Sequence, residues 1–384
     1  MGTMEKLSPG QMSVPAARAG AVLTSDLDAI RATYRLLRDL AAPAACAGVM
    51  KADAYGLGMA AVAPALAAEG CRVFFTAHVD EGMRLRELLP LDATIFVLHG
   101  PPPGVTREFL DYNLIPVLND PGQVADWRAA AQKLGRVLPA AIQFDTGMSR
   151  MGLEPQDLQA LLDDPALLDG IQPVLAMSHL ACADEPAHPV NAMQRGRFAA
   201  CLAALRARFP GLAGSLANSS GIFLGEAFHH QLVRPGAALY GINPQPGSPN
   251  PLRQAVSLAA RIVQTRTVQA GDIVGYGARY TATGPTRIAT ISIGYADGWL
   301  RALSGRGFAF IDGERVPFVG NVSMDSITLD VSGTPEARVA PGQLVELLGA
   351  HQSVDEVAAQ TGTIGYEVLT GLGGRFSRSY GEAG

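Results

Sequence analysis

Lysine is scarce in this sequence of 384 residues. Only three of its 30 basic residues are lysines, namely Lys6, Lys51 and Lys133. Lys51 lies in the stretch VMKADAYGLG (residues 49–58), where an apolar run ends abruptly. Arginine stays protonated at workable pH, whereas a lysine in apolar surroundings can lose its proton and attack a carbonyl carbon. Lys51 is therefore a candidate for forming a Schiff base.

Charged residues are also few. They make up 17% of the chain against 48% hydrophobic residues, which is typical of a well-packed globular protein. The formal net charge of -5 lacks the basic excess that binding to nucleic acid or to an anionic membrane requires, so we expect neither partner. The length allows one large domain and a smaller one.

The sequence has only four cysteines and no CxxC pair, which disfavours a zinc site or a disulfide framework and favours reduced thiols. The first residues lack the basic segment and apolar core of a signal peptide. Alanine-rich runs are interrupted before they reach the roughly 20 residues that a membrane helix needs. We therefore expect a cytoplasmic protein with no membrane association and no bound metal.

Between residues 20 and 243, short apolar stretches alternate with helical ones, after a polar tail predicted for residues 1–19. The first helical pattern follows Ser25, Asp26 and Leu27, which resemble a helix cap. Strands are predicted at 46–50, 72–77, 94–98, 114–118, 138–144 and 173–177, near Ser215 and before Leu239. Helices are predicted at 59–68, 123–134, 155–162 and 193–208. Eight such repeats predict an α/β fold, a (β/α)8 TIM-type barrel, with Lys51 at its mouth.

A proline-rich segment around 242–252 interrupts this alternation and marks a domain boundary. Residues 244–384 then show short strand-like runs separated by Gly, Asp and Pro, at 261–268, 287–293, 308–311, 315–319, 326–331 and 344–348. This pattern predicts a C-terminal, mostly-β domain built from strands. Residues near 20–25 belong either to the barrel or to this β domain.

Polar groups follow several predicted strands, where a barrel places its active site. Two glycines after Tyr55 suggest that the chain turns into a helix there, and a helix start beside a hydroxyl group is suited to phosphate. Ser219 and the backbone of Gly236 are suited to the phosphate that barrels often hold at strands seven and eight. The competing interpretation places Lys51 at a strand end without chemistry and makes Tyr55 a packing residue. Asp145 is interpreted as an acceptor that organises its loop.

Seven motifs in this order resemble those of the alanine racemase family: VMKADAYGLG, FDTGMSRMG, ANSSG, VRPGAALYG, VGYGARYTA, IGYADGW and VSMD. The resemblance extends from Val49 to the C-terminus. It implies an enzyme that uses pyridoxal 5'-phosphate (PLP) to interconvert L- and D-alanine for peptidoglycan, with a barrel and an appended β domain. It also implies a homodimer in which the second domain contributes to the partner's active site.

The resemblance further implies a role for each matching residue. Lys51 would form the internal aldimine and act as one base, and Tyr276 of the partner subunit would be the opposite-face base. The remaining residues are those that would bind cofactor (Tyr55, His179, Asn218, Ser219, Arg234, Gly236, Ala237 and Tyr366) and those that would bind substrate or line its entrance (Arg150, the Met324 backbone and Tyr295). His179 and Tyr295 also have an alternative interpretation as structural residues.

These roles are chemically consistent. Racemisation removes a proton from one face of the α-carbon and returns it to the other, so a single base would usually return the proton it took. Free lysine and tyrosine have pKa values of about 10.4 and 10, which burial and neighbouring cations can lower. Arg234 cannot accept a proton, so it would leave the pyridine nitrogen unprotonated and limit side reactions.

One position departs from the family pattern. Several members carry a carbamylated lysine seven residues before Arg150, whereas this chain has Gln143, which can hydrogen-bond Arg150 but carries no charge. A bound anion is an alternative source of that charge. Alternative functions are a serine or broad-specificity racemase, a non-catalytic PLP carrier and a PLP decarboxylase with the same barrel.

Overall fold

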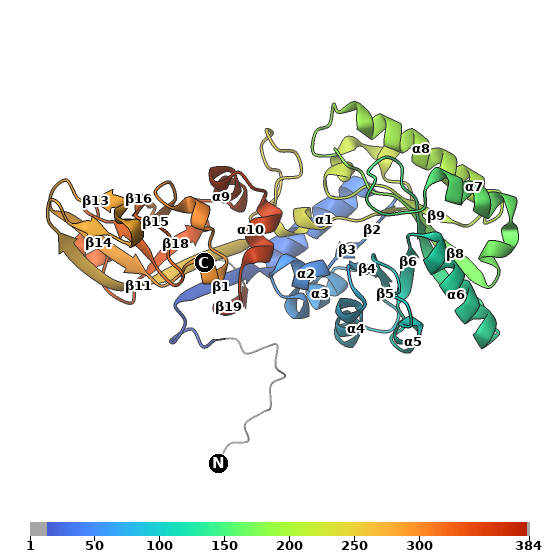
Figure 1. The fold of residues 1–384 in the computed structure, drawn as a ribbon, viewed down its shortest axis with the longest axis horizontal. Helices are drawn as coiled ribbons and strands as arrows, with labels where there is room; N and C mark the ends of the chain where they lie inside the picture. Colours follow the sequence, from blue (N-terminus) through green and yellow to red (C-terminus); the bar gives the residue numbers. More distant parts are fainter. Residues whose placement is uncertain (1–13, 382–384) are drawn as a thin grey trace, which may run out of the picture. The chain divides into compact units, whose positions relative to one another are not determined.

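The structure is a computed structural model that describes residues 14–381, so most of the tail predicted for residues 1–19 lies outside the described residues. The chain forms two compact units. One spans Ala29–Arg253, and the other combines the described residues up to Asp28 with those from Gln254 onward. Figure 1 labels the elements of both units.

The unit from Ala29 to Arg253 contains a parallel sheet whose strands follow one another in chain order. Its members are β3 (Gly48–Val49), β4 (Val73–Thr76), β5 (Thr94–Val97), β6 (Ile115–Leu118), β7 (Leu138–Gln143), β8 (Ile171–Met177) and β9 (Ala213–Ser215). The short strands β2 (Ala45–Cys46) and β10 (Leu232–Val233) pair with each other. Backbone bonds from Gln231 to Gly214 and from Val49 to Pro235 connect β10 to both ends of the sheet and close the barrel. The predicted (β/α)8 barrel is therefore confirmed.

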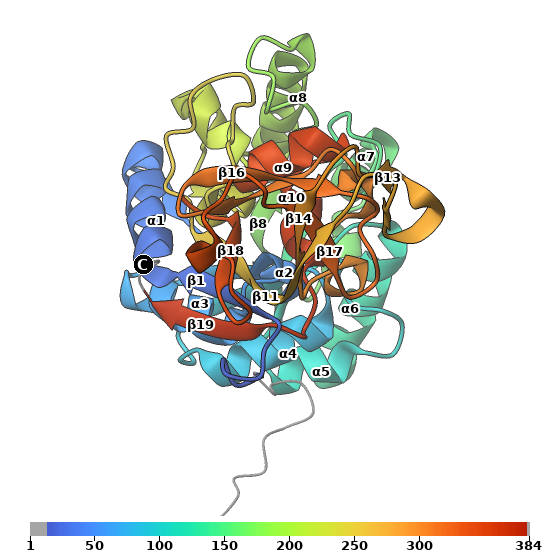
Figure 2. The same ribbon diagram turned by 90° about the vertical axis from the view of Figure 1, so that its left-hand side faces the viewer.

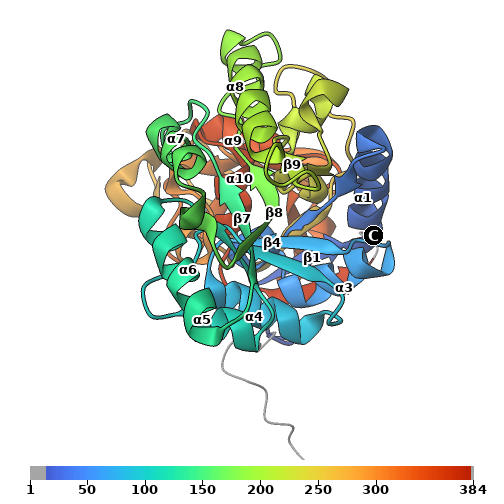
Figure 3. The ribbon, with the colours of Figure 1, turned by 90° about the vertical axis from the view of Figure 1, so that its right-hand side faces the viewer.

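Helices surround these strands, as Figure 3 shows. They are α1 (Leu27–Ala41), α3 (Met59–Ala68), α4 (Val79–Leu88), α5 (Thr106–Asp111), α6 (Pro121–Leu134), α7 (Pro155–Asp163) and α8 (Pro189–Arg206). Helix α6 illustrates how the sequence defines such an element. The Asp120 side chain accepts from the N–H of Gln123, Pro121 occupies the first turn, and Gly135 ends the helix in the left-handed conformation.

The second unit is built on a mostly antiparallel sheet, visible in Figure 2. Its strands run in the order β14 (Thr286–Ile291), β17 (Ile327–Asp330), β16 (Glu314–Val319), β15 (Phe308–Ile311), β18 (Leu344–Leu348), β11 (Val256–Val268), β1 (Ala21–Asp26) and β19 (Ser377–Gly381). The long strand β11 also pairs with β14, which closes the first part of this order into a ring. The predicted C-terminal β domain is confirmed as a fold.

Two features of this unit go beyond what the sequence pattern located. The apolar segment before the first helix is a strand, β1, which lies between β11 and β19. The mostly-β pattern located only the strands, and the unit also contains two helices, α9 (Val354–Thr361) and α10 (Gly365–Gly371). A capping box begins α9, since Ser353 and Glu356 exchange side-chain and backbone hydrogen bonds.

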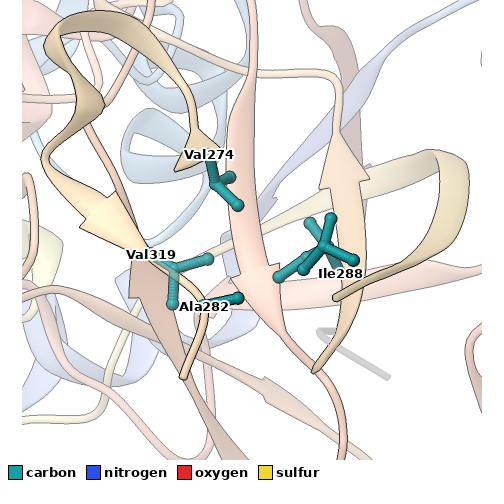
Figure 4. Close-up of a cluster of buried hydrophobic side chains, with 5 residues drawn as sticks. Val274, Ala282, Ile288 and Val319 are labelled. Carbon is teal, nitrogen blue, oxygen red and sulfur yellow. The ribbon is translucent and has the colours of Figure 1, made fainter. Parts of the chain in front are cut away.

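A small hydrophobic cluster anchors a hairpin in this unit (Figure 4). The hairpin consists of β12 (Ile273–Val274) and β13 (Tyr280–Thr281). Val268, Val274, Ala282, Ile288 and Val319 form the buried cluster, and the ring of Tyr280 packs against it. The base of the hairpin is thus fixed by apolar burial.

Among residues 14–381, no helix has both the length and the apolar character needed to cross a membrane.

Candidate active site

The first strand of the barrel is followed by an unusual turn. Ala52, Asp53, Ala54 and Tyr55 all have left-handed backbone angles, with φ between 53° and 56°. Such a conformation costs roughly 1–2 kcal/mol for each residue that is not glycine. The expected helix after the two glycines is confirmed, because α3 begins at Met59, directly after Gly58. Backbone bonds from Gly56 to Ala52 and from Gly58 to Asp53 close the turn.

Lys51 stands at the start of this turn with a half-buried side chain. Its amine lies 5.8 Å from the centroid of the Tyr55 ring. Burial lowers the pKa of Lys51, the cations Arg150 and Arg234 lower it further, and Glu81 acts in the opposite direction. Lys51 therefore loses its proton more readily than a free lysine, as a nucleophile or base requires.

A cradle of small and polar groups lies beside Tyr55. The Ser219 hydroxyl accepts hydrogen bonds from the N–H groups of Gly236 (2.9 Å) and Ala238 (3.2 Å). A Cβ at Gly236 would lie only 2.3 Å from the Tyr55 hydroxyl, so glycine is needed for this approach. The Asn218 side chain accepts from the N–H of Gly221 and stabilises the same turn. Ala237 begins the short helix η4 (Ala237–Tyr240) directly after the cradle.

Arg234 and His179 provide a buried guanidinium and a half-buried imidazole at the ends of β10 and β8. The Arg234 guanidinium is buried and donates to the Ser215 hydroxyl and to the carbonyl of Ser178. Burial, followed by the charges of Arg234, Arg150 and Lys51, lowers the pKa of His179 to about 3. His179 is therefore a neutral imidazole at physiological pH.

The loop after β7 presents Arg150. Asp145 organises this loop, because its carboxylate accepts from the N–H groups of Gly147 (2.8 Å), Met148 (2.9 Å) and Ser149 (3.1 Å). Although burial opposes the effect, these bonds lower the pKa of Asp145. Arg150 is exposed and lines a cleft of about 620 Å³.

Gln143 lies behind this loop and is buried. Its amide is capable of a hydrogen bond to Arg150 but makes none within residues 14–381. The orientation of Arg150 therefore depends on its own loop.

In the second unit, Tyr276 stands at the tip of the hairpin formed by β12 and β13. Its side chain is 76% exposed, while its carbonyl accepts a hydrogen bond from the Asn321 side chain (2.8 Å). Gly275, Gly277 and Ala278 all have positive φ, which shapes the tip. The backbone of Tyr276 is thus fixed while its phenol projects into solvent within this unit.

Two loops that carry other predicted site residues are joined in the same unit. Tyr295 donates its N–H to the carbonyl of Ser323 (3.0 Å), and Ala296 donates to that of Met324 (3.0 Å). The Tyr295 and Met324 side chains are 43% and 52% exposed. Tyr366 is half-buried at the start of α10.

The structure thus places nine predicted residues in the barrel unit and Tyr276, Tyr295, Met324 and Tyr366 in the other unit. Sequence reasoning missed several residues that hold them in place: Glu81 beside the Lys51 turn, Ser215 and the Ser178 carbonyl at Arg234, and Arg375 between the Tyr295 and Met324 loops. Only Glu81 had a local signal, because it lies in the first turn after a strand, where helix-capping residues occur.

Comparison with known proteins identifies the same family for both halves of the chain. The family model described as "Alanine racemase, N-terminal domain" matches residues 25–244, and that described as "Alanine racemase, C-terminal domain" matches residues 255–380. The sequence is 53% identical to a protein of Mesorhizobium japonicum named "Alanine racemase, catabolic", covering 96% of this chain and 95% of that protein. It is also 53% identical to the "Alanine racemase" of Rhodospirillum rubrum, covering 95% and 96%.

Among solved structures, an alanine racemase from Bartonella henselae with covalently bound pyridoxal phosphate matches with a TM-score of 0.90. It is 42% identical in sequence, and the match covers 94% of this chain and 99% of that one.

Proposed function

Because this chain belongs to the alanine racemase family, we propose that it interconverts L- and D-alanine with two bases, Lys51 and Tyr276 of the partner subunit. The enzyme is a PLP-dependent racemase that acts on an amino acid. The proposal adds the roles of individual residues, a homodimer with shared active sites, and a cytoplasmic role in supplying D-alanine for peptidoglycan. One observation carries it, the half-buried Lys51 amine whose pKa is lowered next to the cradle of Tyr55, Ser219 and Gly236.

The barrel residues fit PLP. Lys51 is a deprotonation-prone amine suited to covalent attachment, and the absence of a Cβ at Gly236 leaves room for the Tyr55 hydroxyl beside Ser219. Tyr55, Asn218, Ser219, Gly236 and Ala237 would hold the phosphate together with Tyr366. When bound, PLP supplies an electron sink for the negative charge that develops at the α-carbon.

Arg234 is suited to contact the pyridine nitrogen. Its guanidinium is buried and oriented by Ser215 and by the Ser178 carbonyl, so it keeps a defined direction. Since it has no acidic proton to share at neutral pH, it would leave this nitrogen unprotonated and restrict the electron sink. His179, neutral in this environment, would support the cofactor without adding a positive charge.

Other residues would orient the substrate. Arg150, on a loop organised by Asp145, would bind the substrate carboxylate, since a guanidinium matches a carboxylate in two-point geometry. The backbone at Met324 would provide a second contact, and Tyr295 would line the entrance.

In this proposal, Tyr276 reaches the barrel of the partner subunit and acts together with the lysine of that barrel. In its own unit the phenol is exposed on a hairpin with a fixed base, so it is available to a second copy of the chain. Lys51 would hold the proton on one face of the α-carbon and Tyr276 on the other.

Two substitutions test these roles. Lys51→Ala should abolish the absorbance of lysine-bound PLP and lower turnover by at least about a thousandfold, because both attachment and one base are lost. Lys133→Ala, which changes an exposed lysine at the end of α6, is the matched control and should leave both unchanged. Retained racemisation in Lys51→Ala would refute the assignment.

Tyr276→Phe should keep the cofactor absorbance but impair proton exchange on one face. The measurement is deuterium incorporation from solvent into L- and D-alanine, with L- and D-serine assayed in parallel to determine substrate breadth. Equal, unchanged incorporation from both enantiomers would contradict the role of Tyr276.

A further inference from the structure

Glu81 joins the ends of two neighbouring barrel strands with one carboxylate. One oxygen, Oε1, accepts a hydrogen bond from the N–H of Ala52 (2.6 Å), directly after β3 and Lys51. The other, Oε2, accepts from the N–H groups of Ala77 (2.8 Å) and His78 (3.1 Å), directly after β4. Glu81 therefore caps the start of α4 and at the same time holds the Lys51 turn.

The turn has few other sources of stability at its first residue. The side chain of Ala52 is exposed, so no packing explains its left-handed backbone. Alanine strongly favours right-handed helix, and a right-handed turn would carry Lys51 and Tyr55 in other directions. A bond from a backbone N–H to a carboxylate is stronger than a neutral one. The Glu81 bond therefore favours the left-handed turn at Ala52, together with the backbone bond from Gly56 to the Ala52 carbonyl.

A second contact stabilises the other end of the turn. The Asp53 carboxylate accepts from the N–H of Met59 (2.9 Å) and lies 3.5 Å from Arg84 of α4. Glu81 and Arg84 both belong to α4, so this helix contacts the turn at two points, although the exposed Asp53–Arg84 pair contributes little. Glu81 holds the end that contains the lysine.

We propose that Glu81 is a positioning residue for the racemase reaction, which fixes the left-handed turn after β3 and thereby directs Lys51 and Tyr55 into the cofactor site. This inference rests on the proposed function of Lys51. Glu81 touches neither reacting atoms nor cofactor in this role, and it acts through the backbone of Ala52.

The first test replaces the carboxylate. Glu81→Gln keeps the length of the side chain, but its amide nitrogen would face backbone N–H groups that need an acceptor. We expect PLP to bind the cofactor-stripped protein about tenfold more weakly, and kcat to fall by about the same factor, because a displaced reacting group is costly. Affinity is measured from the absorbance of lysine-bound PLP during titration. Unchanged affinity and kcat would overturn the proposal.

The second test restores the turn without the carboxylate. Glycine adopts left-handed angles freely, and Ala52 buries no side chain, so Ala52→Gly should recover most of the lost PLP affinity in the Glu81→Gln background. Ala52→Gly alone should change affinity and kcat by less than about twofold. If the double variant is as impaired as Glu81→Gln, Glu81 does not act through the turn and the proposal fails.

Two further variants test whether the effect of Glu81 comes from its bridge between the two strand ends. One tests the negative charge alone, and the other tests helix capping in general. Glu81→Asp keeps the charge but is one methylene shorter, so it should lose affinity like Glu81→Gln, and full activity would overturn the bridging role. Glu356→Gln removes a comparable cap at α9 and should leave PLP affinity unchanged. An equal loss of affinity in this control would show a general capping effect and also overturn the proposal. Failure of the Lys51 assignment is recognised separately, by activity in Lys51→Ala.

Discussion

Gly236 is the residue at which one added atom has the clearest consequence. Its Cβ would lie 2.3 Å from the Tyr55 hydroxyl, so Gly236→Ala must displace this ring. Overpacking of this kind typically costs about 1–3 kcal/mol, and we expect PLP affinity to fall by tenfold or more in an absorbance titration. Gly211→Ala, where an added Cβ meets open space, is the control. Equal affinities for the two variants would show that Tyr55 does not contribute to the cradle.

His179 makes the stability of the protein depend on pH. Its pKa is about 3 in the folded protein, against about 6.5 for an unfolded histidine. As pH falls below 6.5, the unfolded chain takes up a proton that folded His179 does not, so stability decreases. The unfolding free energy of the cofactor-free protein is measured by urea titration. When the pH is lowered from 7.5 to 5.0, this free energy should decrease by about 2 kcal/mol less in His179→Gln than in the parent. Parallel pH curves would contradict the neutral state of His179.

The chemical role of a residue could be predicted from the sequence where the role depends on that side chain alone. Lys51 is identifiable because lysine is rare and this one ends an apolar run. Glu81 was not identifiable as a partner, because its contact with Ala52 joins positions 29 residues apart. The left-handed turn was missed for the same reason, since alanine favours a right-handed helix and the carboxylate that opposes this preference at Ala52 is distant in the sequence.

At the scale of elements, Arg375 joins the loops that carry Tyr295 and Met324. It pairs with Asp297 (2.6 Å) in one loop and Asp325 (2.7 Å) in the other. Arg375→Ala should loosen both loops and raise KM for alanine about three- to tenfold, with a smaller change in kcat, because substrate contacts are lost before the bases are affected.

Arg338 provides a matched control for this prediction. It is similarly exposed and also faces two carboxylates, Asp312 and Glu314, in the same unit. Steady-state kinetics of Arg338→Ala should equal those of the parent, since exposed ion pairs contribute little on their own. An unchanged KM in Arg375→Ala would show that the ion-pair bridge does not position the loops.

Elements with strong apolar patterns were predicted well. The strand at 308–311, the strand at 344–348 and the helix at 59–68 have the predicted bounds. Strand β1 was not recognised, because its pairing partners β11 and β19 lie more than 200 residues away in the chain. Helices α9 and α10 are short and follow a run of strands, so their periodicity did not stand out.

For the molecule as a whole, the exposure of Tyr276 leads to a concentration-dependent prediction. This residue lines a groove of about 470 Å³ on the β unit. If it serves the barrel of a partner, specific activity should fall as dilution shifts dimers to monomers. Activity assays over a dilution series, with sedimentation measured at the same concentrations, check this. A monomer with full specific activity would contradict the shared site.

The left-handed turn also restricts which sequences can occupy residues 52–55. Left-handed angles exclude β-branched side chains far more strongly than glycine, asparagine or aspartate. Valine, isoleucine and threonine are therefore incompatible with these four positions even where the side chain is exposed, as at Ala52. In a randomised library selected for D-alanine synthesis, this segment would be limited by backbone handedness at all four positions, and by side-chain volume as well at the buried residues Ala54 and Tyr55.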